Sequence, residues 1–90
     1  MTFFYSKRDK ANRATLTING VKVGRVHFRE NDAWLNPYRV EDLKSKGELE
    51  ELGMIVELDP NNNSFPIKVF VDAANEAEVA TILFKAFYEL

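Results

Sequence analysis

Apolar and polar residues alternate over positions 13–23, and an Asn-Gly pair interrupts the alternation. Asn19 and Gly20 both accept the positive φ angles that a two-residue type I′ turn requires. A chain folded at this pair brings Leu16 opposite Val23. The apolar residues then share one face of the ribbon: Leu16, Ile18, Val21 and Val23. We therefore predict a β-hairpin with its turn at residues 19–20.

The alternation slips by one position near Gly24, since the next apolar residues are Val26 and Phe28. A β-bulge at this glycine adds the extra residue that restores the phase. With this bulge, Arg13 lies across from His27, and the basic side chains gather on the face opposite the apolar one. The residues of this predicted basic face are Arg13, Lys22, Arg25, His27 and Arg29.

Residues 35–38, Leu-Asn-Pro-Tyr, have the pattern of a helix start. Asn36 can act as N-cap and Pro37 can take the first helical position. We predict a helix from 36 to about 46, with Gly47 as its left-handed C-terminal stop. Residues 48–52 form another helical turn or a continuation of this helix, which ends at Gly53. The side chains of Trp34, Leu35 and Tyr38 are then expected to pack beneath the helix.

A second hairpin is predicted from two apolar segments, residues 54–58 and 65–71, with Leu58 opposite Phe65. Pro66 has no N–H to donate to a neighbouring strand, which favours an edge position for its strand. Asp72 is then expected to cap a helix that runs to the C-terminus.

These elements, with a short strand at residues 3–5, follow the order (β)ββα-ββα. This order is typical of an α+β fold, here an antiparallel sheet of two hairpins with two helices packed on one face. Ninety residues are enough for one hydrophobic core. We expect a single domain over residues 1–90.

The composition removes several classes of chemistry. The chain has no cysteine and a single histidine, which excludes disulfides, thiol nucleophiles and Cys/His zinc sites. No serine stands in a nucleophile-elbow motif, so no catalytic residue is assigned. We expect a non-enzymatic protein without cofactor or metal. Carboxylates converging in a deep pocket, from Glu41, Glu48 or Asp59, would be the enzymatic alternative. Without a signal peptide or an apolar run of about 20 residues, we expect a cytoplasmic protein that does not contact membranes.

Charge is distributed unevenly along the chain. Residues 1–30 carry seven basic and two acidic residues, whereas residues 31–90 carry five basic and twelve acidic residues. The basic hairpin face either solubilises the sheet or binds a macromolecule of opposite charge. A protein partner is favoured over nucleic acid, because the net charge is −2 and the hairpin face has no aromatic residue of its own.

The predicted C-terminal helix has more apolar surface than one sheet contact requires. Its core-facing stripe is flanked by a second stripe: Val79, Ile82, Ala86 and Leu90. Either the first helix covers this second stripe, or another chain does, as in a homodimer or a complex with a partner.

These patterns favour a regulator or stoichiometric inhibitor that acts by protein–protein contact. Small domains of this kind are often encoded by phages and other mobile elements, which is an analogy and not a property of these residues. The alternative function is nucleic-acid binding through the basic β-hairpin face.

Overall fold

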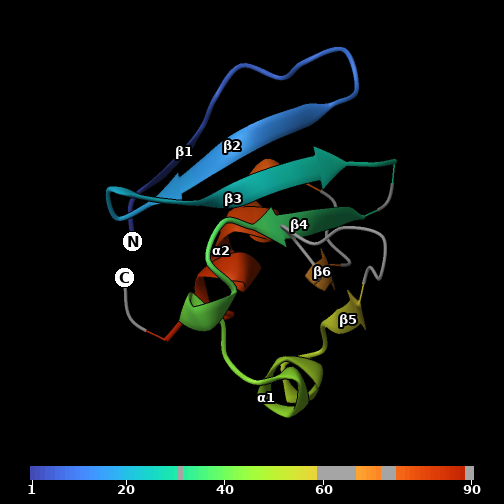
Figure 1. Cartoon of the computed structure of the whole chain (residues 1–90). Helices are drawn as coiled ribbons and strands as arrows, with labels where there is room; N and C mark the ends of the chain where they lie inside the picture. Colours follow the sequence, from blue (N-terminus) through green and yellow to red (C-terminus); the bar gives the residue numbers. More distant parts are fainter. Residues whose placement is uncertain (31, 59–66, 72–74, 89–90) are drawn as a thin grey trace.

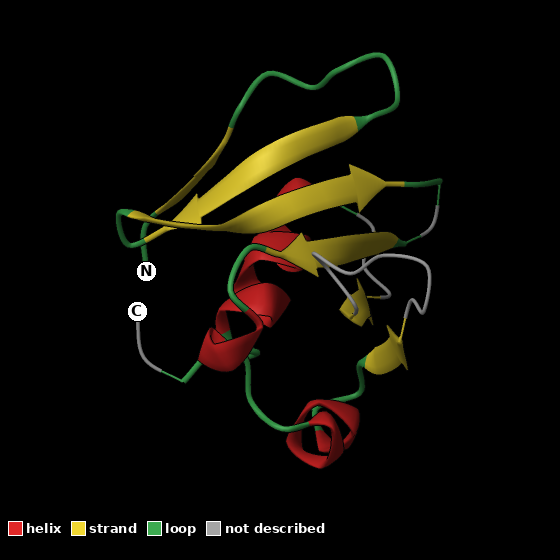
Figure 2. Ribbon diagram, viewed as in Figure 1, coloured by secondary structure: helices red, strands yellow, loops and turns green. Residues whose placement is uncertain are grey.

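A computed structural model describes residues 1–30, 32–58, 67–71 and 75–88 of the chain (Figure 1). It has an antiparallel sheet of six strands in the order β1-β2-β3-β4-β6-β5, together with two α-helices and one short 3₁₀ helix (Figure 2). The α+β class is therefore confirmed. The strands are β1 (Phe3–Tyr5), β2 (Arg13–Ile18), β3 (Val21–Phe28), β4 (Ala33–Pro37), β5 (Ile55–Leu58) and β6 (Ile67–Val71). The helices are the 3₁₀ helix η1 (Val40–Asp42), α1 (Lys46–Glu51) and α2 (Glu76–Phe84).

The first hairpin forms as predicted, with positive φ angles of 50° at Asn19 and 82° at Gly20. Ile18 lies opposite Val21 across the turn. The Asn19 side chain also accepts a hydrogen bond from the backbone N–H of Thr2, at 3.0 Å. This bond holds the start of the chain beside the turn, where β1 joins the sheet next to β2.

The predicted β-bulge is present, and it shifts the partner of Leu16 by one residue. Leu16 lies opposite Gly24 instead of Val23, so Val23 is the extra residue. Beyond the bulge, Arg13 lies opposite His27, as predicted. The expectation that Val21 is in the core is wrong, because this residue sits directly after the turn and is 39% exposed.

The predicted helix at residues 36–46 is wrong. Residues 33–37 form β4, in which buried Ala33, Leu35 and Pro37 alternate with half-buried residues. A residue before proline is disfavoured in the helical region of backbone space, and Asn36 is instead extended. Pairing with β3, in which Val26 lies opposite Leu35, therefore determines the local structure.

The first α-helix, α1, corresponds to the helical turn predicted at 48–52 and begins two residues earlier, at Lys46. Ser45 is its N-cap: the Ser45 Oγ accepts from the Glu48 N–H and donates to the Glu48 carboxylate, at 3.3 and 3.0 Å. The Ser-x-x-Glu spacing is that of a capping box, but the Glu48 carboxylate accepts from the Ser45 hydroxyl and not from its backbone N–H. Gly47 lies inside the helix and is not its stop. Gly53 follows the helix with a φ of 88°, as expected for a C-terminal glycine.

The second hairpin has its register displaced by two residues, with Leu58 opposite Ile67. A shift of two preserves the parity of the predicted pairing. Phe65 and Pro66 lie outside the described residues. The edge position inferred from Pro66 is wrong, because β6 lies between β4 and β5.

The last helix ends at Phe84, before the C-terminus of the chain. Asp72 lies outside the described residues, and the N-cap of α2 is Asn75, which accepts from the Glu78 N–H at 2.9 Å. After α2 the chain runs beside the segment that follows η1. Leu43 forms a β-bridge with Phe87, and the Lys44 N–H donates to the Ala86 carbonyl at 2.8 Å.

The second apolar stripe, Val79, Ile82, Ala86 and Leu90, is covered in part by the chain itself. Val79 and Ala86 are buried in the same core as Leu16, Val26 and Leu49. Ile82 packs against that core and is only partly buried, and Leu90 lies outside the described residues. The chain itself therefore covers Val79 and Ala86.

We predict that Gly24→Ala destabilises the fold. A Cβ at this position would collide with the Asn36 carbonyl oxygen and lie 2.8 Å from Leu35 Cδ1, so β3 and β4 would have to separate. The expected loss in the free energy of unfolding is about 1–3 kcal/mol, measured by urea denaturation. Gly47→Ala is the matched control, because nothing lies within 4 Å of its added Cβ. In this helix it should be neutral or stabilise by up to about 1 kcal/mol. Equal effects of the two substitutions would contradict the close β3–β4 contact.

Candidate functional site

Strands β2, β3 and β4 present two different faces. One set of alternating residues belongs to the core that also contains Val79, Ala80 and Leu83 of α2. The other set lies on the side away from this helix, which we call the open face. In register across the three strands, the open face carries Arg13, Thr15, Arg25, His27, Trp34 and Asn36.

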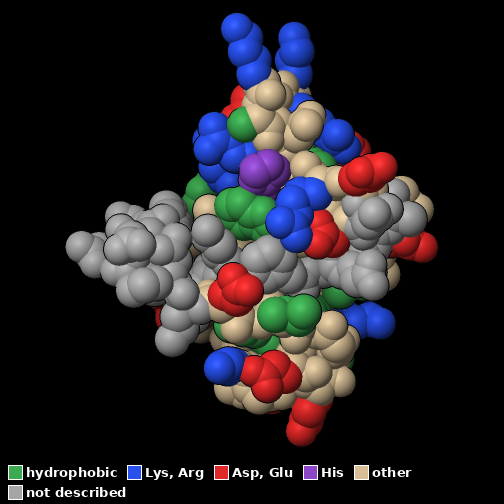
Figure 3. Space-filling model, turned by 90° about the vertical axis from the view of Figure 1, so that its right-hand side faces the viewer, with side chains coloured by type: hydrophobic (Ala, Val, Ile, Leu, Met, Phe, Trp, Pro, Cys, Tyr) green, Lys and Arg blue, Asp and Glu red, His purple; other side chains and the backbone are tan. Residues whose placement is uncertain are grey.

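The open face contains a hollow of about 270 Å³. Its lining combines two guanidinium groups, two aromatic rings and an amide: Arg13, Arg25, His27, Trp34 and Asn36. The ring centroids of His27 and Trp34 are 4.8 Å apart, with an angle of 55° between the ring planes. Figure 3 shows this side of the molecule, with the single histidine (purple) beside a hydrophobic side chain and between basic ones.

Three of the five residues predicted for the basic face line this hollow: Arg13, Arg25 and His27. Lys22 lies beyond the bulge, opposite Thr17, and is exposed. Arg29 follows β3 and forms two hydrogen bonds of 2.6 Å with the Asp32 carboxylate. The bulge and the end of β3 therefore separate these two cations from the hollow.

Trp34 and Asn36 are the residues that sequence reasoning placed elsewhere, beneath and at the start of a helix. Their signal in the sequence is the alternation within residues 33–37, where Trp34 and Asn36 stand between apolar Ala33, Leu35 and Pro37. In the backbone register, Phe70 of β6 lies opposite Trp34, and Ile55 of β5 lies opposite Phe70. Ile55 is 63% exposed.

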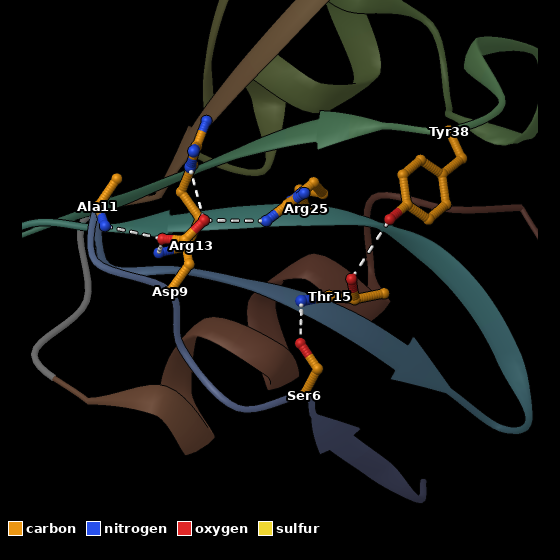
Figure 4. A network of polar contacts seen from close by, with 7 residues as sticks. All are labelled: Ser6, Asp9, Ala11, Arg13, Thr15, Arg25 and Tyr38. Atoms are coloured by element: carbon orange, nitrogen blue, oxygen red, sulfur yellow. Dashed lines mark hydrogen bonds and ion pairs between the residues drawn. The ribbon is translucent and has the colours of Figure 1, made fainter.

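Asp9 connects the two arginines of the hollow (Figure 4). Its Oδ2 accepts from Arg13 Nε and from Arg25 Nη2, each at 3.1 Å. Its Oδ1 accepts from the backbone N–H groups of Ala11 and Arg13, at 2.8 and 3.0 Å. The hydrogen bond from the Arg13 backbone, followed by that from Ala11 and the charge of Arg13, lowers the pKa of this carboxyl group.

These ion pairs lie at the surface. The side chains of Arg13 and Arg25 are 48% and 45% exposed, and that of Asp9 is 34% exposed. Exposed pairs of this kind contribute only about 0–1 kcal/mol, since water competes for both charges. Two guanidinium groups share one carboxylate, so the cluster keeps one net positive charge. A ligand can therefore compete for the arginines at low cost.

Asn36 brings an unusual polar group to the hollow. Its side-chain oxygen Oδ1 is buried. In the described part of the chain, it is the one buried side-chain nitrogen or oxygen atom without a hydrogen-bond partner. Buried acceptors are ordinarily paired, because leaving one unpaired costs about 1–3 kcal/mol. The hollow thus combines hydrogen-bond donors, aromatic rings and an unused acceptor, which is a set of groups for recognition.

Metal binding has no comparable basis in the described residues, since no group of three or more His, Asp or Glu side chains is placed to hold an ion. Asp59, one of the three carboxylates named for an enzymatic pocket, lies outside them. Glu48 lines a different, small surface depression with Lys44, Glu51 and Leu52.

Comparisons of the sequence and the structure with known proteins found no match. No family model matches the chain, and no curated protein or solved structure is significantly similar to it. Among the helices that the structure describes, none is long and apolar enough to cross a membrane.

We predict that Asp9→Asn lowers the melting temperature more at pH 7 than at pH 2. Because the folded state lowers the pKa of Asp9, its contribution to stability is present above the unfolded value near 3.8 and is lost as the pH falls through the folded value. The difference between the parent and the variant should therefore shrink from pH 5 to pH 2, as measured by thermal melts across this range. A difference that stays constant with pH would contradict the assigned interactions of Asp9.

Proposed function

We propose that this protein is a small non-enzymatic binding protein that contacts a partner protein through the open face, as a regulator or stoichiometric inhibitor. The observation that carries the proposal is the hollow in which Arg13 and Arg25 stand beside Trp34. Arginine and tryptophan are enriched among the few residues that supply most of the binding energy in protein interfaces. Such residues act best where a partner can fill a concave site and exclude water.

The surroundings of the hollow also support a protein partner. Ile55 lies two strands from Trp34 in the backbone register and is exposed, so this sheet also presents apolar surface. A centre of aromatic and arginine side chains with polar groups at the rim is typical of protein interfaces. The positive excess at Arg13 and Arg25 would speed association with an acidic partner and make it sensitive to salt.

A second candidate, binding of single-stranded nucleic acid, gains from one observation. Trp34 supplies a stacking surface beside His27, Arg13 and Arg25, on a face where the hairpin itself has no Phe, Tyr or Trp. Bases stack on such rings on the open sheets of several RNA-binding domains. The net charge of −2 and the pairing of both arginines with Asp9 favour the protein partner instead.

We predict that Arg25→Glu removes the partner that the parent protein captures from native lysate. The substitution reverses a half-exposed charge at the hollow, so we expect a loss of affinity of about tenfold or more without loss of folding. Captured proteins are identified by mass spectrometry and then titrated as purified components. Lys85→Glu is the matched control, because it makes the same charge change at an exposed position after α2. Equal loss in both variants, or in neither, would refute the role of the open face.

The nucleic-acid candidate has a separate test. If it holds, the protein binds a dT₁₂ oligonucleotide with an affinity that falls steeply with added salt, and Trp34→Ala weakens this binding about tenfold. Fluorescence anisotropy of a labelled oligonucleotide measures both effects. We expect no binding at low salt, which would leave the protein partner as the remaining candidate.

A further inference from the structure

We propose that the hollow of the open face is a carboxylate-binding site, which receives an Asp or Glu side chain of the partner protein. The partner's carboxylate binds Arg13 and Arg25 in competition with Asp9, and a hydrogen-bond donor of the same segment reaches Asn36. This inference rests on the proposed function, and it specifies the chemistry by which the partner is recognised.

Asp9 shows how a carboxylate fits these arginines. Its two oxygens have separate tasks: Oδ1 holds the backbone at Ala11 and Arg13, whereas Oδ2 alone accepts from the two guanidinium groups. Asp9 takes one N–H from each guanidinium, of the five that each carries. Donors that line the hollow therefore remain for a second carboxylate, and planar guanidinium groups bind carboxylates with two parallel hydrogen bonds.

The charge of the cluster matches a single carboxylate. Arg13 and Arg25 carry two positive charges against one negative charge on Asp9. One carboxylate balances this excess. A nucleic-acid strand would instead bring a series of phosphates to a chain whose net charge is −2. Twelve acidic residues lie within residues 31–90 and would repel these phosphates. An acidic protein segment fits the local charge without this repulsion.

Asn36 adds a second requirement for the occupant. Its buried Oδ1 lacks a donor, while the rest of the side chain is half-buried and lines the hollow. The terminal torsion of asparagine is broad, so the side-chain amide can rotate when an occupant enters. A peptide segment supplies donors from its backbone N–H groups next to the acidic side chain. The combination of carboxylate and neighbouring N–H is thus found in a peptide and not in inorganic phosphate.

The experiment uses the full chain and two small probes that differ in one group. N-acetyl-L-glutamate α-methylamide carries the carboxylate and two amide N–H groups, and the glutamine analogue replaces the carboxylate with a neutral amide. Each is titrated into the ¹⁵N-labelled protein, and chemical shifts are followed at the Trp34 indole N–H and the Asn36 side-chain amide. The chain has only one tryptophan, so the indole signal is unambiguous. We expect saturable shifts with the glutamate probe and at least about tenfold weaker binding of the glutamine probe.

Three variants make the assignment specific. Arg25→Gln should weaken the glutamate probe about tenfold, whereas Lys22→Gln, the same charge change on the same strand beyond the bulge, should leave its affinity unchanged. Asp9→Asn should strengthen binding about threefold. The asparagine keeps an Oδ1 for the N–H groups of Ala11 and Arg13 and removes the competing carboxylate, so the turn is retained. The dispersion of the amide spectrum verifies that each variant is folded.

Several results would overturn the inference. Equal binding of the two probes, equal effects of Arg25→Gln and Lys22→Gln, or no gain in Asp9→Asn would each do so. Tighter binding of inorganic phosphate or of uridine monophosphate than of the glutamate probe would assign the hollow to a phosphate-bearing ligand. Concentration-dependent shifts of the same signals without any probe would assign it to a second copy of this chain. If Arg25→Glu still abolishes capture of a partner while the probes fail, the open face remains the interface and only the carboxylate assignment is lost.

Discussion

The pairing of β3 with β4 determines which side chains reach the open face. This pairing depends on the close approach of the two backbones at Gly24, where any side chain would meet the Asn36 carbonyl. From this contact the register continues as Arg25 opposite Asn36 and His27 opposite Trp34. The bulge at Val23 sets the phase of the same strand against β2, which brings Arg13 to His27. The register of β3 with β2 and with β4 therefore brings together all five residues that line the hollow.

Local sequence signals predicted β3 correctly, but they predicted a helix where β4 lies. The Asn-Gly turn and the phase slip near Gly24 are set by backbone preferences of a few residues, so they can be read without tertiary information. Asn36-Pro37 is compatible with two structures. It can begin a helix as N-cap and first residue, or it can end a strand, because the residue before proline prefers an extended backbone. The ladder with β3 favours the strand, and nothing local to residues 35–38 reports that ladder.

The same limit applies to the candidate site. Arg13, Arg25 and His27 were predicted on one face, because they follow from strand alternation and the bulge. Trp34 and Asn36 were missed, since their place depends on β4. Asp9 was missed for another reason: it lies in a turn before β2, and it reaches Arg25 only after the hairpin has closed. Two overlooked signals were local: the alternation within residues 33–37, and Ser45 with Glu48, whose Ser-x-x-Glu spacing marks a helix start.

The arrangement links fold stability to recognition in a simple way. Residues that face α2 supply the core, and the alternate residues of the same strands are left for charged and aromatic groups. The cost of this design is visible in the unpaired Asn36 oxygen and in arginines held only by exposed ion pairs. Groups that are weakly satisfied within the chain are available to a partner, which is the physical basis of the proposed binding.

The most direct test of this account is a nuclear Overhauser spectrum of the free protein across residues 23–46. The account predicts cross-strand contacts between the backbones of Arg25 and Asn36 and between the rings of His27 and Trp34. Medium-range contacts between residues three positions apart throughout 36–46 would instead show a helix in place of β4. That result would separate Trp34 from the arginines and remove the hollow.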